Sequence, residues 1–193
     1  MAVRSLANTD ISPLASVLKH AFSADPGLRW VIPDDLDWHR VAGPWFTLVL
    51  KETLALGHGL TDAESRGVSL WEPPDMQRPW LGQLISLFRV VFMLRGNFDR
   101  ALQVQAALRG YRPTRPYWYL SYIATDPEHQ GSGIGGSLLS PVLELADRER
   151  LPVFLDCSNA DNISFYTSHG FNLVDNVELP GGPTLWPMMR EPR

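Results

Sequence analysis

Apolar and polar positions along the chain follow two periods, one of about 3.6 residues and one of two. The longer period predicts helices at 10–22, 36–56, 80–108, 136–150 and 161–169, the third of them broken near Gly96-Asn97. Short runs rich in aromatic and β-branched residues predict strands at 3–6, 59–63, 68–71, 117–125, 152–157, 171–177 and 184–189. Asp25-Pro26-Gly27 is interpreted as a turn that ends the first helix, and Pro44 and Pro141 as kinks inside later helices.

The predicted strands at 117–125 and 152–157 are separated by a loop and a helix. A strand, a crossover of roughly 25 residues and another strand are typical of a parallel pair. The chain has 193 residues, enough for one α/β domain with a sizeable core and too few for two. We therefore predict a single α/β domain.

Composition narrows the classes of function. The formal net charge is −4 and no basic block is present, so we expect no nucleic-acid partner. The single cysteine, Cys157, excludes an internal disulfide and a thiolate metal cluster, and we predict no metal site. The N-terminus lacks a signal-peptide pattern, and the longest apolar stretch, 84–94, is about half a membrane span. We expect a cytoplasmic protein that does not act at a membrane.

A glycine-rich loop lies between the predicted strand at 117–125 and the helix that follows it. Four of the six residues from Gly131 to Gly136 are glycine, which turns backbone N–H groups inward and leaves no Cβ to block an anion. Such a loop at a helix N-terminus is typical of a phosphate site. A tight turn without a ligand is the alternative. A Walker loop is excluded, because Ser137 stands where that motif needs lysine.

Two nucleotide-binding motifs remain for this loop. Gly131, Gly133 and Gly136 match the dinucleotide fingerprint G-x-G-x-x-G, and Asp156 could serve as its ribose-binding acid. Five residues separate that loop from its strand, however, and too little chain follows residue 157 for a doubly wound sheet. Gln130, Gly133 and Gly135 instead fit the coenzyme A loop R/Q-x-x-G-x-G/A. The coenzyme A motif is favoured.

These segments resemble the GNAT superfamily of N-acetyltransferases. The likeness lies in residues 119–135, 154–159, 162–171 and 180–186, and it covers roughly 117–190. Within the superfamily it is similar to the branch that contains puromycin N-acetyltransferase. The resemblance implies the GNAT fold, with a mixed central sheet of six to seven strands, flanking helices and a splayed parallel pair. Residues 1–112 would form an acceptor-side half with a helical insertion at about 78–109, and 113–193 the half that binds acetyl-CoA.

The resemblance also assigns a cofactor site. Backbone groups of Ile123, Ala124 and Thr125 would contact the pantetheine arm where the strand bulges. Asn159, Asn162 and Phe165 would border the cofactor, and Tyr166 would face its sulfur. The pyrophosphate would be held by Gln130, Gly131, Ser132, Gly133, Ile134, Gly135 and Gly136. Many relatives have lysine or arginine at the position of Ser132, so a direct charge on the phosphates is missing here.

The spacing of Asn159, Asn162 and Tyr166 places them on one face of the predicted short helix. A phenol can give a proton to a thiolate leaving group, so Tyr166 is a candidate acid; packing in the core is its alternative. Asn159 is equally a candidate N-cap. Asp156 is a candidate base acting through water, or a turn cap.

Aromatic residues of the first two thirds of the chain are candidates for an acceptor pocket. We predict contacts from Trp30, Trp71, Phe92 and Trp118, with core packing as the alternative for each tryptophan.

The combined prediction is an enzyme that uses acetyl-CoA to acetylate a primary amine of a small molecule, possible examples being an antibiotic or an aminonucleoside. It would act as a monomer or homodimer. Acetylation of a protein N-terminus or lysine is one alternative, and a non-catalytic acyl-CoA sensor is another.

Overall fold

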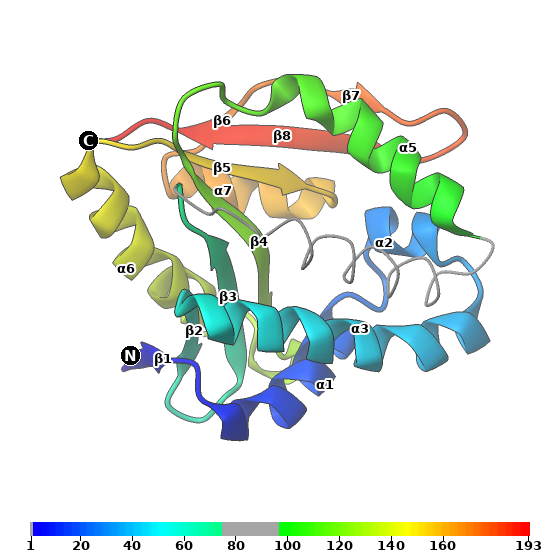
Figure 1. Ribbon diagram of the computed structural model, residues 1–193, viewed down its shortest axis with the longest axis horizontal. Coiled ribbons are helices and arrows are strands. Elements are labelled where there is room, and N and C mark those ends of the chain that lie inside the picture. The colour runs from blue at the N-terminus through cyan, green and yellow to red at the C-terminus, as the bar shows by residue number, and fades with distance from the viewer. Residues whose placement is uncertain (1, 75–96) are drawn as a thin grey trace.

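The computed structural model describes residues 2–74 and 97–193. Its centre is a mixed sheet with the strand order β1-β2-β3-β4-β5-β8-β6, in which β7 pairs with β8 (Figure 1). The strands are β1 (Val3–Ser5), β2 (Gly59–Asp62), β3 (Gly67–Glu72), β4 (Trp118–Thr125), β5 (Val153–Cys157), β6 (Asn172–Leu173), β7 (Val177–Glu178) and β8 (Thr184–Arg190). The α-helices are α1 (Ile11–Ala21), α2 (Pro26–Val31), α3 (Asp35–Leu56), α5 (Phe98–Leu108), α6 (Ile134–Glu149) and α7 (Ile163–Ser168).

The sheet opens between its two central strands. β4 and β5 are parallel and pair over three residues only, from Trp118 opposite Val153 to Leu120 opposite Leu155. On its other side β4 pairs with β3, and the register shifts so that Ser121 has no partner. This bulge bends β4 away from β5 at the point where their pairing ends. The predicted splayed pair is therefore present, and its gap lies beyond Leu120 and Leu155.

Separate apolar clusters cover the two faces of the sheet. On one face α1 and α3 pack on β3 and β4, with Leu14, Leu18, Phe46 and Leu50 fully buried. On the other face α6 and α7 pack on β4 and β5 through residues that include Leu139, Tyr166 and Phe171. A smaller cluster joins α5 to β7 and β8. In Figure 1, β5 and β8 cross the upper part of the molecule, and α3 and α1 lie below.

Most predicted elements are confirmed, and two predictions are wrong. Asp25-Pro26-Gly27 is not a simple turn, because Asp25 caps a further helix, α2, by accepting a hydrogen bond from Leu28 N–H at 2.8 Å. Proline at the first position of α2 suits a helix start. The strand predicted at 171–177 is two short strands, β6 and β7, that both pair with β8.

Helix α6 begins at Ile134, two residues earlier than predicted, so the end of the glycine loop forms its first turn. Pro141 lies inside α6 and Pro44 inside α3, as predicted. The first of the two helices expected in 80–108 lies outside the described residues, and α5 is the second. Among the described residues, none of the helices has the length and apolar character needed to cross a bilayer.

Candidate active site

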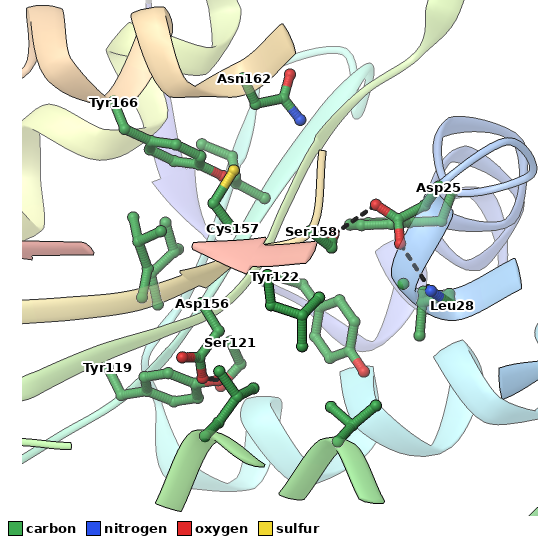
Figure 2. Close-up of a pocket in the computed structure, with 18 of the residues that line it drawn as sticks. Asp25, Leu28, Tyr119, Ser121, Tyr122, Asp156, Cys157, Ser158, Asn162 and Tyr166 are labelled. Carbon is green, nitrogen blue, oxygen red and sulfur yellow. Dashed lines mark hydrogen bonds between the residues drawn. The ribbon is translucent and has the colours of Figure 1, made fainter. Parts of the chain in front are cut away.

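Two neighbouring cavities meet at the gap between β4 and β5. The larger, of about 640 Å³, lies among the end of β4, the glycine loop and α7; we call it the cofactor cavity. The smaller, of about 200 Å³, lies among β4, β5, α2 and α5; we call it the acceptor cavity (Figure 2). Both are lined by Phe22, Asp25, Ile123, Asn162 and Tyr166. These shared residues mark the junction where a group could pass from one cavity to the other.

The glycine loop presents open backbone at the cofactor cavity. Gly131 has φ +75° and Gly133 has φ +84°, a conformation that side chains with a Cβ rarely adopt, and no atom lies within 4 Å of an added Cβ at either. In the described part of the chain, no hydrogen bond is found from a backbone N–H of residues 133–136 to a protein group. The first turn of α6 adds its own unpaired N–H groups. This cradle fits a diphosphate.

Two further glycines allow α6 to approach α7. A Cβ at Gly135 would lie 3.2 Å from the Phe165 ring, and one at Gly136 would lie 3.0 Å from His169 Nε2. The other ring nitrogen of His169, Nδ1, lies 2.8 Å from the carbonyl oxygen of Phe165 in the last turn of α7. Close packing here brings the N-terminus of α6 beside the residues that line the cavity.

Fixed positive charge is absent from the described lining of the cofactor cavity. Its basic residues there are His129 and His169, and neither lysine nor arginine contributes. Ser132 stands where many relatives have lysine or arginine, and it does not line the cavity. Its hydroxyl donates to the His129 carbonyl at 2.5 Å. Gln130 does line it, and its amide lies 3.5 Å from the Thr125 carbonyl. Binding of an anion here depends mainly on backbone dipoles.

The three residues predicted on one face of a short helix lie in succession, with Asn159 before a 3₁₀ turn, Asn162 at the end of that turn and Tyr166 in α7. Asn159 caps the 3₁₀ turn η5 (Ala160–Asn162) by accepting from Asp161 N–H at 3.1 Å, so the cap role is confirmed, and it also lines the cofactor cavity. Asn162 follows and lines both cavities. Tyr166 is 8% exposed and packs against Phe171, so its ring is part of the core as well as of the junction. Phe165 lines the cofactor cavity beside them.

Burial dominates the acidity of the groups at the junction. Burial raises the pKa of Tyr166, and the neighbouring Cys157 and Asp25 raise it further. The Tyr166 phenol therefore stays protonated at neutral pH, which suits a proton donor. Burial also raises the pKa of the Cys157 thiol to about 11, and its sulfur donates to the Asn159 carbonyl. Cys157 is a packed thiol and not a thiolate nucleophile.

Asp156 lies in the acceptor cavity, on the side opposite Tyr166 (Figure 2). Its Oδ2 accepts from the Tyr119 hydroxyl at 2.9 Å, and the Arg112 guanidinium lies 3.8 Å from the same oxygen. Burial raises the pKa of Asp156, and Tyr119 and Arg112 partly counter that rise. Its Oδ1 is buried and has no hydrogen-bond partner in the described residues, a condition that costs about 1–3 kcal/mol unless a donor is supplied.

The geometry of the two cavities agrees with the protein family that the chain matches. The family model of the acetyltransferase (GNAT) family matches residues 73–171, about half of the chain. The chain belongs to the GNAT family of acetyltransferases. An uncharacterised N-acetyltransferase of Schizosaccharomyces pombe is 26% identical over 208 residues, covering 100% of this chain and 84% of that protein.

Solved structures of GNAT proteins share the fold. A structure from Corynebacterium glutamicum, titled as histone acetyltransferase HPA2 and related acetyltransferase, has a TM-score of 0.73 and 23% identity, and covers 100% of this chain and 96% of its own. Arylalkylamine N-acetyltransferase 2 of Aedes aegypti has a TM-score of 0.71 and 15% identity, and covers 100% and 99%. PaiA N-acetyltransferase of Thermoplasma acidophilum, solved with coenzyme A, has a TM-score of 0.57 and 13% identity, and covers 98% of both chains.

The tryptophans predicted to contact the acceptor lie elsewhere in this GNAT fold. Trp71 is fully buried and its indole N–H donates to Ser69, while Trp118 is 3% exposed and donates to Glu149. Trp30 is held by the turn between β7 and β8, where it donates to the Gly181 carbonyl at 3.0 Å. None of the three lines either cavity: Trp71 and Trp118 are buried, Trp30 is partly buried, and the N–H of each donates inside the protein. Phe92 lies outside the described residues.

Several residues of the site were missed by sequence reasoning. Tyr119 and Arg112 complete the surroundings of Asp156, yet they are 37 and 44 positions away from it in the sequence. Phe22 and Asp25 line both cavities and come from the N-terminal half. Only Asp25 had a local signal, the Asp-Pro pair that is typical of a helix start.

Proposed function

We propose that this GNAT enzyme transfers an acetyl group from acetyl-CoA directly to a primary amine of a small molecule. The observation that carries the proposal is the junction of the two cavities at Tyr166, Asn162 and Ile123. One cavity offers unpaired backbone donors suited to a diphosphate, and the other offers a small space with a buried carboxylate. When bound, acetyl-CoA supplies the acetyl group as a thioester.

The residues of the cofactor cavity have separate tasks in this proposal. Backbone groups of residues 130–136 bind the pyrophosphate, while Asn159, Asn162 and Phe165 border the pantetheine arm. The backbone of 123–125 lies beyond the bulge, where β4 is no longer paired with β5, so its polar groups can bind the arm and polarise the carbonyl. Holding both reactants at the junction lowers the barrier by proximity.

Tyr166 and Asp156 move the protons. The amine nitrogen forms a bond to the acetyl carbon as the bond from that carbon to sulfur breaks. Asp156 takes one proton from the ammonium group and later releases it to solvent. Tyr166 gives its proton to the departing sulfur and regains one from the nitrogen. Their positions on opposite sides of the acceptor cavity suit this division (Figure 2).

Two further features support a small acceptor. The acceptor cavity, of about 200 Å³, is smaller than the 300–1,000 Å³ typical of pockets for drug-sized ligands. An acetyltransferase of similar fold is named for arylalkylamines. The likeness to the puromycin N-acetyltransferase branch keeps aminonucleosides among the candidates. This likeness extends to the Pro180-Gly181-Gly182 turn, where the Gly181 carbonyl accepts a hydrogen bond from the Trp30 indole.

Thiol release from acetyl-CoA across a panel of amines, including aminonucleosides, tests the proposal. We expect release with at least one small primary amine and none with a tertiary amine. Acetylation of a peptide array in preference to every small amine would instead favour a protein acetyltransferase. Tight binding of acetyl-CoA without transfer to any amine would favour a sensor.

A further inference from the structure

The acceptor cavity contains three charged side chains among its described lining residues, namely Asp25, Arg112 and Asp156. Both oxygens of Asp25 already accept hydrogen bonds, from Leu28 N–H at 2.8 Å and from the Ser158 hydroxyl at 2.6 Å. Asp25 therefore fixes α2 against the end of β5. Among the oxygens of these two carboxylates, Asp156 Oδ1 is the one that accepts no hydrogen bond from the described residues.

The orientation of Asp156 is fixed by its neighbours. Its side chain is 10% exposed, and Tyr119, which donates to Oδ2, stacks on Phe154 with ring centroids 6.2 Å apart. Arg112 lies over the Tyr119 ring at 4.9 Å and reaches the Asp156 carboxylate only at 3.8 Å, which is beyond hydrogen-bond distance. Arg112 thus offsets the carboxylate charge without satisfying Oδ1.

The rest of the cavity wall limits what else an acceptor can carry. Much of it is apolar, formed by Leu28, Val31, Val104, Leu108, Leu155 and Leu185. Arg112 is the cation in the described lining, and it already faces Asp156 and the Tyr119 ring. An anionic group on the acceptor would compete with Asp156 for the charge of Arg112, and a second ammonium group would meet only the Asp25 carboxylate, whose two oxygens already accept hydrogen bonds. Either would be desolvated without compensation.

We propose that the Asp156 carboxylate, whose Oδ1 lacks a donor, is the subsite for the acceptor's ammonium group, and that the acceptor is a compact amine with one positive charge, an apolar body and no anionic group. This inference rests on the proposed function. The ammonium group gives one proton to Asp156, which makes the nitrogen a nucleophile. After the nitrogen–carbon bond forms and the carbon–sulfur bond breaks, a second proton leaves the nitrogen and replaces the one that Tyr166 gave to sulfur.

A substrate comparison tests the class of acceptor. The probes are 2-phenylethylamine, L-phenylalanine, which adds a carboxylate, and 1,4-diaminobutane, which has a second ammonium group. At saturating acetyl-CoA we expect kcat/KM for 2-phenylethylamine to exceed both others by at least about tenfold, the order expected for a charged group left without a partner. An equal or higher kcat/KM for L-phenylalanine or 1,4-diaminobutane would overturn the proposal.

Variants test the subsite itself. Asp156→Asn should lower kcat/KM for 2-phenylethylamine on the order of 10- to 100-fold, while the KM for acetyl-CoA is unchanged. The matched control is Asp37→Asn on the surface of α3, where Asp37 pairs with Arg40 outside both cavities; it should keep wild-type kinetics. If Asp156→Asn does not fold, Tyr119→Phe removes the donor to Oδ2 and should cause a smaller fall in the same direction.

The variant Arg112→Gln tests whether the guanidinium competes with the acceptor's ammonium group or binds a carboxylate on the acceptor. Our proposal expects a lower KM for 2-phenylethylamine, because the competing cation is gone. Loss of activity confined to L-phenylalanine would mean that Arg112 binds an acceptor carboxylate, and it would overturn the proposal. If the wild-type enzyme released no thiol with any amine, the proposed function itself would fail. Thiol release that is unchanged in Asp156→Asn would rule out only the ammonium subsite and would leave the proposed function standing.

Discussion

The two cavities that meet at Tyr166 are built by different means. The part of the cofactor cavity proposed to hold the diphosphate is one continuous stretch, the glycine loop of residues 130–136, whose backbone is left open by its glycines. The acceptor cavity is assembled from side chains that lie far apart in the sequence, with Asp156, Tyr119 and Arg112 at its polar end. A main-chain site recognises a charge pattern that many ligands share, whereas a side-chain site can be specific to one acceptor.

The difference also appears in how charge is handled. The described lining of the cofactor cavity has no lysine or arginine, so an anion there would be held by dipoles. In the acceptor cavity, a carboxylate with a raised pKa lies in a wall of mixed apolar and polar residues, beside the one guanidinium of its described lining. We therefore expect changes in the two cavities to have separable effects on donor and acceptor kinetics.

The largest effect is expected at the junction. Tyr166→Phe should lower kcat on the order of 10²-fold or more, because the departing sulfur loses its proton donor, while the Kd for acetyl-CoA is nearly unchanged. Steady-state kinetics and calorimetry measure the two. Tyr117→Phe is the matched control, since the Tyr117 ring packs against Phe154 and lines neither cavity. Wild-type turnover in Tyr166→Phe would remove Tyr166 from the mechanism.

A smaller effect is expected in the glycine loop. Gly133→Val should weaken acetyl-CoA binding on the order of tenfold, because a β-branched residue resists φ +84° at a cost of about 1–2 kcal/mol. Gly57→Val imposes the same strain at φ +77° in the C-cap of α3, outside both cavities. Gly57→Val should lose stability but keep the wild-type Kd. Equal Kd values in all three proteins would show that the loop does not hold the cofactor.

The smallest effect is expected away from both cavities. Hydrogen bonds from Arg4 chiefly lower the pKa of Asp10 from 3.8 to about 2. A lowered pKa in the folded state gives stability that is present above about pH 4 and is lost as the pH falls toward 2. Because Arg4 is 40% exposed, solvent weakens the pair, and Asp10→Asn should cost about 1–2 kcal/mol of unfolding free energy at pH 7.

Urea unfolding at pH 7 and at pH 2 measures the Asp10 contribution. The difference between wild type and Asp10→Asn should shrink at the lower pH, and acetyl-CoA affinity at pH 7 should not change. A stability difference that is the same at both pH values would contradict the assigned pKa. A loss of acetyl-CoA affinity would mean that the two regions are coupled.

The sequence carried enough information to predict where the larger of the two cavities lies. Its signals are local: four glycines before a helix, a strand before them, and a short helix with Asn159 and Tyr166 on one face. The structure places Gly131, Gly133 and Tyr166 at one cavity. The parallel pair was also predictable, because a strand, a helix and a strand in succession favour that arrangement, whereas its splay was expected only from the resemblance to the GNAT superfamily.

The acceptor side could not be predicted in the same way. Tyr119 and Arg112 reach Asp156 only through the pairing of β4 with β5 and the path of the chain after α5. The tryptophans misled the prediction, because a large apolar ring suits a pocket and a core equally well. Trp71 and Trp118 are in the core, with their N–H groups bonded to Ser69 and Glu149.

Calorimetric titration of acetyl-CoA into the wild-type protein tests the central claim most directly. The open backbone donors of the glycine loop predict one binding site per chain, with the affinity weakened in Gly133→Val and kept in Tyr166→Phe. Absence of any binding heat across several temperatures, in protein shown to be folded, would contradict the assignment of the glycine loop to the cofactor.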